Sequence, residues 1–462
     1  EIVQKIGEDE HRAFAYIKRK MSPDLADQVL AMGIPGVYAD REYKRYYPTG
    51  EVTAHLLGTT NVDGNGQEGM ELVMDSGLRG MDGARRAVRD GKRRIIEKIE
   101  EVRHPVPGKE IALSIDSRLQ YIAHRELKNT VAQHRARSGT LVLMDVKTGE
   151  VLAMSNQPAF NPNSRSQTAP DVSRNRAITD LFEPGSTMKP FAIACALELG
   201  LTNPRAIINT NGGVWHVGTN VVKDVHNYGV MDVTKVIQKS SNVGTSKIAL
   251  TIPPRKLWAF YHNLGFGQTL ETNYPGEARG RLSDYHGWST FEQATLSFGY
   301  GVSVSALQLA RAYTALGNEG LMPMASLTRV DEEPEVHRIM SAKTASMMMS
   351  MLETVVSKEG TAFQAAVPGY RVAGKTGTVK KLGAHGYTAS SYNALFAGVA
   401  PASDPRLVMV VMIDEPSAGD YYGGVVAAPV FSRVMQEALR VLNIAPDQTM
   451  PSIMVARQDG PA

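Results

Sequence analysis

Glu183-Pro-Gly-Ser-Thr-Met-Lys189 is the stretch on which both the predicted fold and the predicted chemistry depend. Pro184-Gly185 interrupts the chain and the apolar run 191–199 follows, so a helix is expected to begin close to Ser186. Unpaired N–H groups at a helix start favour developing negative charge. Lys189 follows Ser186 by three residues and therefore shares its helix face. A serine needs an adjacent base to attack at neutral pH, and a lysine with a lowered pKa can be that base.

Ser-x-x-Lys occurs once in the chain and is weak evidence alone, because a capping serine followed by an exposed lysine gives the same pattern. A second element, Ser240-Ser-Asn242, offers a hydroxyl that can relay a proton and an amide that can hold a peptide carbonyl. Ser-x-Asn also occurs at Ser173-Arg-Asn175 and Ser391-Tyr-Asn393, where loop residues that satisfy local backbone are expected. The pattern alone does not choose among the three copies.

The third element is Lys375-Thr-Gly-Thr378, on an expected strand. Lys375 could place a positive charge near the serine and its lysine. Gly377 would let a substrate backbone approach the strand, and the hydroxyls of Thr376 and Thr378 could bind a carboxylate. A second Lys-Thr-Gly, at 147–149, lacks the fourth hydroxyl residue and is interpreted as a hairpin turn.

The elements expected around these motifs indicate an α+β fold. Expected strands, a hairpin among them, precede a block with helical spacing, and further strands and a closing helix follow it. Short links between the last strands favour antiparallel neighbours over crossover units, so an antiparallel sheet with an inserted helical subdomain is predicted. The expected strands are 111–115, 139–146, 151–155, 370–379, 394–400 and 407–413, and the expected helical segments are 117–134, 178–316 and 425–442.

Three segments are predicted along the chain of 462 residues. Two prolines and a glycine at Pro105-Val-Pro-Gly108 favour a boundary there. The predicted division is a non-catalytic pedestal domain over 1–106, a catalytic domain over 107–446 and a flexible tail over 447–462. The first segment is rich in charge and glycine and shows no chemistry of its own.

Bulk composition excludes several classes of function. Hydrophobic residues make up 43% and charged residues 21%, which is typical of a globular protein, and the net charge of +3 gives no reason to expect a nucleic acid. Cys195 is the only cysteine and is expected in the core. Zinc-binding spacings are absent from the sequence, so neither a metal nor a cofactor is predicted. The chain starts at Glu1 without a methionine, and an anchoring segment is expected upstream of it.

Ser-x-x-Lys, Ser-x-Asn and Lys-Thr-Gly-Thr, in that order, resemble the signature of penicillin-binding proteins and serine β-lactamases. The copy at Ser240 is the one that lies between the other two elements. The stretches Ser297-Phe-Gly-Tyr-Gly-Val-Ser-Val304, Asp414-Glu-Pro416, Gly66-Gln-Glu-Gly-Met-Glu71 and Leu78-Arg-Gly80 extend the resemblance to nearly the whole chain. They are similar to class B penicillin-binding proteins, and within that class to the division-specific septal transpeptidases.

The resemblance implies a mechanism. Lys189, kept partly neutral by burial and by Lys375, would take the proton of Ser186, which attacks the penultimate D-alanine carbonyl of a peptidoglycan stem peptide. Ser240 would pass a proton to the leaving D-alanine and Asn242 would hold the stem peptide. An amine of a neighbouring stem would then take the acyl group.

The resemblance also implies binding groups. The backbone N–H groups of Ser186 and Thr378 would form the oxyanion hole. Tyr387, Tyr421 and Tyr422 resemble an aromatic wall, although surface tyrosines beside glycines would give the same sequence. β-Lactams would acylate the serine. The resemblance further implies an inner-membrane anchor and a periplasmic catalytic domain. It also implies a membrane glycan polymerase and other division proteins as partners.

Alternatives remain at this stage. A β-lactamase or D,D-carboxypeptidase would use the same residues and transfer the acyl group to water. A β-lactam sensor or scaffold would bind without turnover. Gly369-Tyr-Arg-Val-Ala-Gly-Lys-Thr376 matches a P-loop, which requires a strand before it and a helix after it. A Ser-His-Asp hydrolase has no Gly-x-Ser-x-Gly elbow here, and Asp224 and His226 are interpreted as loop and wall residues.

Overall fold

The computed structural model describes residues 15–90, 95–164, 169–383 and 386–448. They divide into two compact units, one drawn from Glu1–Gly50, Leu56–Glu110 and Asn161–Gln167, the other from Glu51–His55, Ile111–Phe160 and Thr168–Ala462. The boundaries proposed at 106/107 and 446/447 remain predictions. Of the expected tail, the Asp447 carboxylate accepts hydrogen bonds from the Arg371 N–H at 2.6 Å and the Ser403 hydroxyl at 2.7 Å. Residues 449–462 lie outside the described part.

The first unit consists of short elements and one ribbon. Its elements are α2 (Pro23–Ala31), η1 (Gly50–Val52, at its edge), α4 (Gly69–Val73), α5 (Asp75–Leu78), β1 (Ala84–Arg89) and β2 (Ile95–Arg103), while α3 (Ala54–Leu57) falls where the chain changes units. β1 and β2 pair antiparallel, with Arg86 opposite Glu100. Opposite charges across a ribbon favour this register. Glu71, from the Gly66–Glu71 stretch, is buried and pairs with Arg45 at 2.9 Å.

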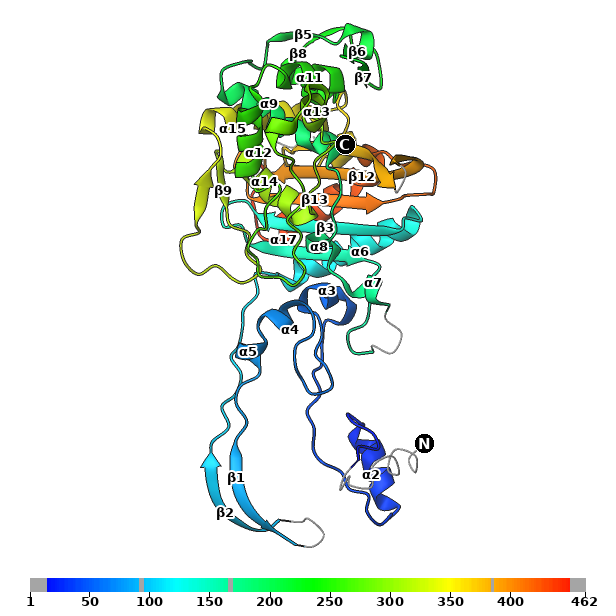
Figure 1. The fold of residues 1–462 in the computed structure, drawn as a ribbon, viewed down its shortest axis with the longest axis vertical. Coiled ribbons are helices and arrows are strands. Elements are labelled where there is room, and N and C mark those ends of the chain that lie inside the picture. Colours follow the sequence, from blue (N-terminus) through cyan, green and yellow to red (C-terminus); the bar gives the residue numbers. More distant parts are fainter. Residues whose placement is uncertain (1–14, 91–94, 165–168, 384–385, 449–462) are drawn as a thin grey trace, which may run out of the picture. The chain divides into compact units, whose positions relative to one another are not determined.

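A five-stranded antiparallel sheet organises the second unit and confirms the predicted α+β architecture (Figure 1). The strand order is β11-β12-β13-β3-β4, with β3 (Ser138–Asp145), β4 (Val151–Gln157), β11 (Ala373–Gly383), β12 (Gly386–Ala400) and β13 (Leu407–Asp414). Every residue of the central strand β13 is buried, as expected for a strand covered on both faces. Strands from the beginning and from the end of the predicted second segment therefore meet in one sheet.

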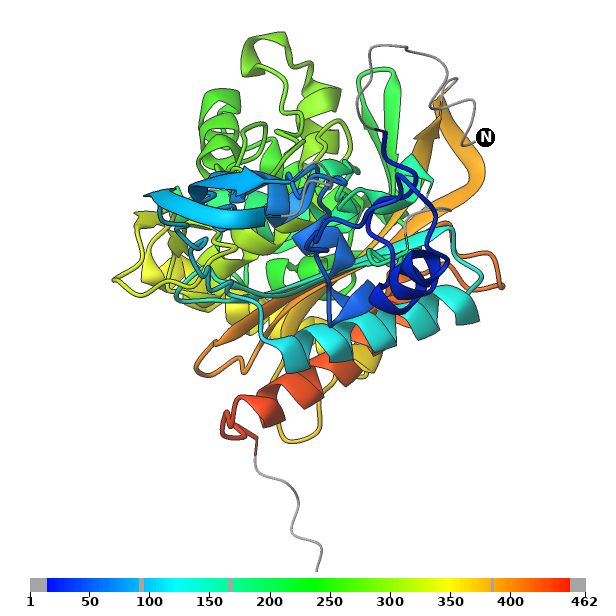
Figure 2. The same ribbon diagram turned by 90° about the horizontal axis from the view of Figure 1, so that it is seen from below.

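Helices cover the two faces of this sheet. α6 (Ser117–Gln133) and α17 (Ala428–Val441) lie side by side on one face, and α14 (Ala306–Gly317) packs on the other (Figures 1 and 2). The Asp116 side chain caps α6 by accepting from the Arg118 and Leu119 N–H groups, so the predicted cap is confirmed. The closing helix is divided after α16 (Gly423–Val426), because Pro429 has no N–H to continue the helical bonding.

The stretch expected to be mostly helical also contains strands, which corrects the prediction. Short ribbons are formed by β5 (Ile207–Asn209) with β8 (Val230–Asp232) and by β6 (Val214–Val217) with β7 (Asn220–Lys223). A third ribbon, of β9 (Leu321–Pro323) with β10 (Val336–Arg338), lies after that stretch, in a part of the chain for which no element was predicted. The expected strand 111–115 was also wrong, since Leu113 forms an isolated bridge with Thr328. Few-residue ribbons carry too little alternation to be recognised in a sequence.

The remaining helices belong to the second unit and surround the motif residues. They are α7 (Pro170–Ser173), α8 (Arg176–Thr179), η2 (Gly185–Met188), α9 (Lys189–Glu198), η3 (Asn211–Gly213), α10 (Val233–Gln238), α11 (Asn242–Ala249), α12 (Pro254–Asn263), η4 (Tyr285–Gly287), α13 (Thr290–Leu296), α15 (Ala342–Glu353), η5 (Thr354–Val356) and η6 (Phe363–Ala365). From Lys189 to Leu197 every residue of α9 is buried. This helix is therefore part of the core.

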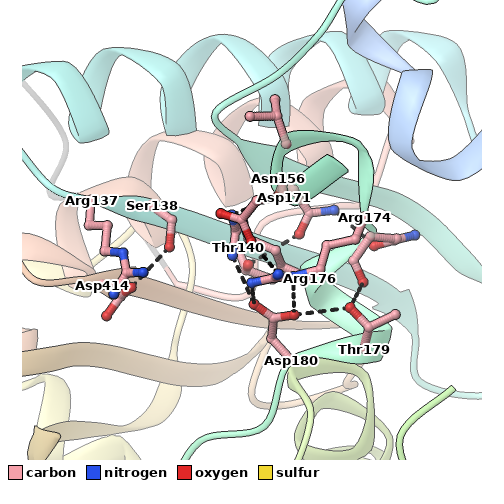
Figure 3. A network of polar contacts seen from close by, with 12 residues as sticks. Arg137, Ser138, Thr140, Asn156, Asp171, Arg174, Arg176, Thr179, Asp180 and Asp414 are labelled. Atoms are coloured by element: carbon pink, nitrogen blue, oxygen red, sulfur yellow. Dashed lines mark hydrogen bonds and ion pairs between the residues drawn. The ribbon is translucent and has the colours of Figure 1, made fainter. Parts of the chain in front are cut away.

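A polar network, buried at Asn156 and Asn175 and partly exposed at Asp180, holds the chain just before the Glu183–Lys189 motif (Figure 3). Asn156 on β4 donates to Asn175 at 2.8 Å and accepts from the Thr140 hydroxyl at 3.1 Å. Beyond α8, Asp180 accepts from Arg176 at 2.9 Å and from Arg174 at 2.8 Å. The segment that leads into Phe182–Ser186 is thereby tied to the sheet.

Candidate active site

Ser186 lies in the 3₁₀ turn η2, directly before the long buried helix α9. The preceding Gly185 has a φ of 55°, a left-handed conformation that glycine adopts without strain. A Cβ atom at Gly185 would lie 2.2 Å from Cγ2 of Val379 on β11. Glycine therefore allows the nucleophile turn and the Lys-Thr-Gly-Thr strand to approach each other, which brings together the first and third motifs.

Lys189 is fully buried at the start of α9, and its ammonium group meets the second motif. Its Nζ donates to the backbone carbonyl of Ser240 at 2.5 Å and to the Ser240 hydroxyl at 3.0 Å. Burial lowers the pKa of Lys189 well below its ordinary value, the positive charge of Lys375 lowers it further, and Asp224 opposes both. A buried lysine of this kind can be neutral at physiological pH and can then accept a proton.

Ser240 occupies a strained position between α10 and α11. Its φ is 61°, which is uncommon for a residue with a side chain. Such conformations cost on the order of 1–3 kcal/mol and cluster at functional sites. The neighbouring Ser241 caps α11 by accepting from the Gly244 N–H at 2.8 Å. The strained backbone presents both the carbonyl and the hydroxyl of Ser240 to Lys189.

Asp224 holds the second motif in place, a role that its sequence does not reveal. Its carboxylate accepts from the Ser241 hydroxyl at 2.7 Å and from the N–H groups of Asn242 at 2.5 Å and Val243 at 3.0 Å. A carboxylate at the first N–H groups of a helix is favourable. The Asn242 side chain in turn donates to the Lys223 carbonyl at 2.8 Å. Nothing in the sequence signals this role, because only the fold brings Asp224 next to the second motif.

The third motif lies on β11, an edge strand of the main sheet. Lys375 is fully buried, and burial lowers its pKa to about 7. A Cβ atom at Gly377 would lie 3.2 Å from the Pro184 carbonyl oxygen, the Thr187 Cγ2 atom and the Leu395 Cβ atom. The glycine therefore makes room for the nucleophile turn, a different reason from the substrate approach expected of it.

The two threonines of the motif have separate partners. The Thr376 hydroxyl lies 3.0 Å from the hydroxyl of Thr361, and the Thr378 hydroxyl accepts from the Gly423 N–H at 3.0 Å. Thr361 stands 15 residues before Thr376 in a Gly-Thr-Ala loop, and sequence reasoning missed it. A hydroxyl group can donate one hydrogen bond to a carboxylate oxygen.

The three tyrosines of the predicted aromatic wall fall into two groups. Tyr421 stacks against Tyr422 at 4.6 Å and against Tyr392 of β12 at 4.2 Å, so Tyr392 is an additional member. Tyr387, which is 49% exposed, instead contacts the ring of Tyr300 at 5.4 Å. The binding role of all three predicted tyrosines stays a prediction.

The decoy motifs have structural explanations. Asn175 bonds Asn156 in the buried network, and 147–149 forms the turn between β3 and β4, as predicted. The 391–393 copy lies within β12, so the expectation that it belongs to a loop was wrong. The P-loop match lacks its context, because β11 begins at Ala373 and a strand, not a helix, follows Lys375.

Two searches of the described residues were negative. Within 15–90, 95–164, 169–383 and 386–448, histidine, cysteine and acidic side chains do not gather in groups of three that could hold a metal ion. Across the same ranges, no helix has the length and apolar character to cross a membrane. Cys195 is buried and unpaired, as expected for a core residue, and burial raises the pKa of its thiol to about 12.

Comparisons with known proteins agree with this site. Residues 139–436 match the penicillin binding protein transpeptidase domain, and residues 2–113 match the penicillin-binding protein dimerisation domain. The Escherichia coli peptidoglycan D,D-transpeptidase FtsI is 45% identical over 434 residues, 94% of this chain and 73% of that protein. A probable peptidoglycan D,D-transpeptidase of Pseudomonas aeruginosa, PbpC, is 41% identical over 98% of this chain and 80% of its own length.

A solved structure supports the same assignment. The transpeptidase domain of penicillin-binding protein 3 from Burkholderia pseudomallei matches with a TM-score of 0.69 and 42% sequence identity. The match covers 74% of this chain and 100% of that domain. The paired domains and these relatives confirm the resemblance inferred from the motifs: the chain belongs to the penicillin-binding proteins, in class B, close to the division-type transpeptidases.

Proposed function

We propose that this protein is a peptidoglycan D,D-transpeptidase of septal wall synthesis that forms its acyl-enzyme on Ser186. The observation that carries the proposal is the fully buried Lys189, three residues after Ser186, with its Nζ bonded to Ser240 and its pKa lowered by burial and by Lys375. A buried amine between a hydroxyl and a second cation is suited to accept the proton of a serine nucleophile.

The acylation step follows from this arrangement. Lys189 takes the Ser186 hydroxyl proton while the serine oxygen bonds the penultimate D-alanine carbonyl carbon of the stem peptide. The C–N bond to the terminal D-alanine then breaks, and its nitrogen receives a proton by way of Ser240, which lies 3.0 Å from the Lys189 amine. The amine of a second stem then attacks the ester carbonyl and gives a proton to Lys189. Lys189 passes that proton to the departing Ser186 oxygen, which restores the serine hydroxyl and the neutral lysine.

Binding groups surround the reacting carbonyl in this proposal. The N–H groups of Ser186 and Thr378 stabilise the oxyanion. Hydroxyls of Thr376 and Thr378 bind the terminal carboxylate, Asn242 holds the stem peptide, and β11 offers its free edge to an extended peptide, since edge strands pair readily with added strands. Support comes from the proximity of the nucleophile turn to this strand, where Gly185 nearly contacts Val379.

A β-lactam would acylate Ser186 in the same way and stay bound. Hydrolytic relatives, the β-lactamases and D,D-carboxypeptidases, are disfavoured by the accompanying dimerisation domain and by relatives named D,D-transpeptidases. All three motifs that the proposed reaction requires are complete in this sequence, which disfavours a sensor or scaffold without turnover.

The cellular setting is part of the proposal. A protein of this kind would work at the periplasmic face of the bacterial inner membrane, anchored by a helix upstream of this sequence. A membrane glycan polymerase and other division proteins would be its partners, with stem peptides as substrates and β-lactams as inhibitors.

Acyl transfer is the direct test. The protein is incubated with a stem pentapeptide donor and a labelled D-amino acid acceptor, and products are separated by mass spectrometry. Formation of the exchanged peptide, with release of one D-alanine, is expected. Loss of that product in Ser186→Ala but not in the surface control Ser350→Ala locates the chemistry. Hydrolysed tetrapeptide without any exchanged peptide would instead assign the protein to the carboxypeptidases.

A further inference from the structure

Glu183, three residues before Ser186, joins three segments around the nucleophile turn. Its Oε1 atom accepts a hydrogen bond from the Gly301 backbone N–H at 2.8 Å and another from the Tyr387 hydroxyl at 3.1 Å. Gly301 belongs to the loop that follows α13, and Tyr387 is the second residue of β12. One carboxylate oxygen therefore connects the turn that carries Ser186 to two other segments of the unit.

Those segments also contact one another directly. The rings of Tyr300 and Tyr387 meet edge to face at 5.4 Å. The backbone of Phe182 pairs with that of Val304 through hydrogen bonds of 3.0 and 2.9 Å, and the Gly185 N–H donates to the Gly299 carbonyl at 3.2 Å. The loop of Gly301 therefore runs along the turn of Ser186, and the side chains of Glu183 and Tyr300 both extend this contact to Tyr387 of β12.

The second carboxylate oxygen of Glu183 differs from most buried polar atoms, which have a hydrogen-bond partner. Oε2 of Glu183 is buried and has no hydrogen-bond partner among the described residues. Burial raises the pKa of the Glu183 carboxyl above its ordinary value, and the Gly301 and Tyr387 donors oppose this shift. The carboxylate as a whole is half-buried, and leaving its Oε2 atom buried without a partner costs free energy.

We propose that Glu183 is a positioning residue for acylation of Ser186, an inference that rests on the proposed function. Its ionised carboxylate holds the Ser186 turn against the Gly301 loop and the start of β12, so that the nucleophile and the N–H of Thr378 keep the spacing that the reacting carbonyl requires. Glu183 touches neither the substrate nor the proton in this account. Loss of its charge loosens both hydrogen bonds, since charged acceptors bind about twice as strongly as neutral ones.

Protonation of Glu183 has opposite effects on acylation and on stability. A carboxyl whose folded pKa is raised contributes stability at low pH that is lost as pH rises through that pKa. The ionised form therefore contributes less to the free energy of unfolding than the protonated form does, while it supports acylation. The phenols of Tyr300 and Tyr387 face this carboxyl, and both have raised pKa values, so neither titrates near neutral pH. A purely structural residue would instead stabilise the fold and the reaction together.

The test measures the second-order rate constant of acylation by a labelled penicillin, from pH 5 to pH 9, together with the melting temperature. Glu183→Gln keeps the shape and one acceptor oxygen, and is expected to lower the rate constant about 5- to 30-fold at pH 7.5 without lowering the melting temperature. The acid limb that Glu183 adds to the wild-type profile disappears in this variant. Tyr387→Phe, which keeps the ring against Tyr300, shows a smaller loss, and the two losses are not additive in the double variant.

Glu198→Gln is the matched control, at the far end of the same helix that begins with Lys189. Glu198 accepts from the Ser341 hydroxyl at 2.8 Å and from the Thr344 hydroxyl at 2.5 Å. Its variant should keep the wild-type acylation profile. The inference is overturned by wild-type rates in Glu183→Gln at all pH values, or by a joint fall of rate and melting temperature with additive losses. A wild-type protein that forms no adduct on Ser186 overturns the proposed function, and this inference with it.

Discussion

Lys189 and Ser240 are joined by two hydrogen bonds, from Nζ to the backbone carbonyl at 2.5 Å and to the hydroxyl at 3.0 Å. The contact requires a left-handed backbone at Ser240, with a φ of 61°, and a lysine with no exposed surface. Both features cost free energy of folding, and together they place the Lys189 amine on the hydroxyl of Ser240. Four predictions follow from this pair and its surroundings.

Replacing Lys189 by methionine should abolish most acylation without unfolding the protein. The Lys189 side chain is fully buried. Replacing a buried charged group by an apolar group of similar size often leaves the free energy of unfolding unchanged or raises it. Loss of a general base lowers a rate by about 10²- to 10⁴-fold. Stopped-flow acylation by penicillin and a melting curve check the two parts. A rate within a factor of two of wild type would exclude Lys189 as the base.

Stability should rise with pH because of the buried lysines. Burial lowers the pKa of Lys375 to about 7, whereas in the unfolded chain it is about 10.4. Between these values the unfolded state binds more protons, so the free energy of unfolding increases as pH rises. Lys189 shifts in the same direction. Urea midpoints from pH 7 to pH 9.5 should increase in the wild type and less steeply in Lys375→Met, and a flat wild-type profile would contradict the burial of both amines.

Asp224→Asn should slow acylation through the second motif. The substitution weakens the acceptor of the Ser241 hydroxyl and of the first N–H groups of α11, and misplacement of a catalytic segment can cost on the order of 10- to 100-fold. Asp224 also raises the pKa of Lys189, so its neutralisation should move the acid limb of the pH profile to lower pH. Asp232→Asn, in the cap of α10, is a control with a similar helix contact. An unmoved limb would show that Asp224 does not act on the lysine.

Thr361→Val should weaken recognition of carboxylate-bearing ligands, because its hydroxyl lies 3.0 Å from that of Thr376. Loss of one hydrogen bond of about 0.5–1.5 kcal/mol corresponds to roughly 2- to 10-fold in acylation efficiency. Thr361→Ser should restore it. A matched ligand whose carboxylate is replaced by an amide should show no difference between the variants, and an equal loss for both ligands would indicate a general structural effect.

The architecture could be predicted from the sequence where segments are long and apolar. The runs around Val142 and Val410 alternate little, yet the turn at Gly149 and the short link before Leu407 indicate an antiparallel neighbour for each. The pairings of β3 with β4 and of β12 with β13 confirm it. The capped helix after Asp116 is confirmed for the same reason, since its signals are local. Three-residue ribbons such as Ile207–Asn209 could not be predicted, because they depend on contacts with distant strands.

The site could be predicted only as far as motif order reaches. Ser186, Lys189 and Ser240 are named by their patterns, but Asp224, Thr361, Tyr392 and Glu183 have no pattern of their own. Each acquires its partner through the fold, as when Glu183 meets Tyr387 across 204 residues of sequence. The need for a glycine at 377 could not be predicted either, because it depends on the close approach of the Thr187 side chain, which belongs to another motif.

Ser186 as the site of the acyl-enzyme is the central claim, and one measurement tests it most directly. The intact protein is treated with penicillin, its mass is recorded, and the modified peptide is mapped by tandem mass spectrometry. We expect one penicilloyl group per chain, on Ser186, persisting for minutes or longer and absent from Ser186→Ala. An adduct on any other residue, or one that Ser186→Ala still forms, would contradict the account.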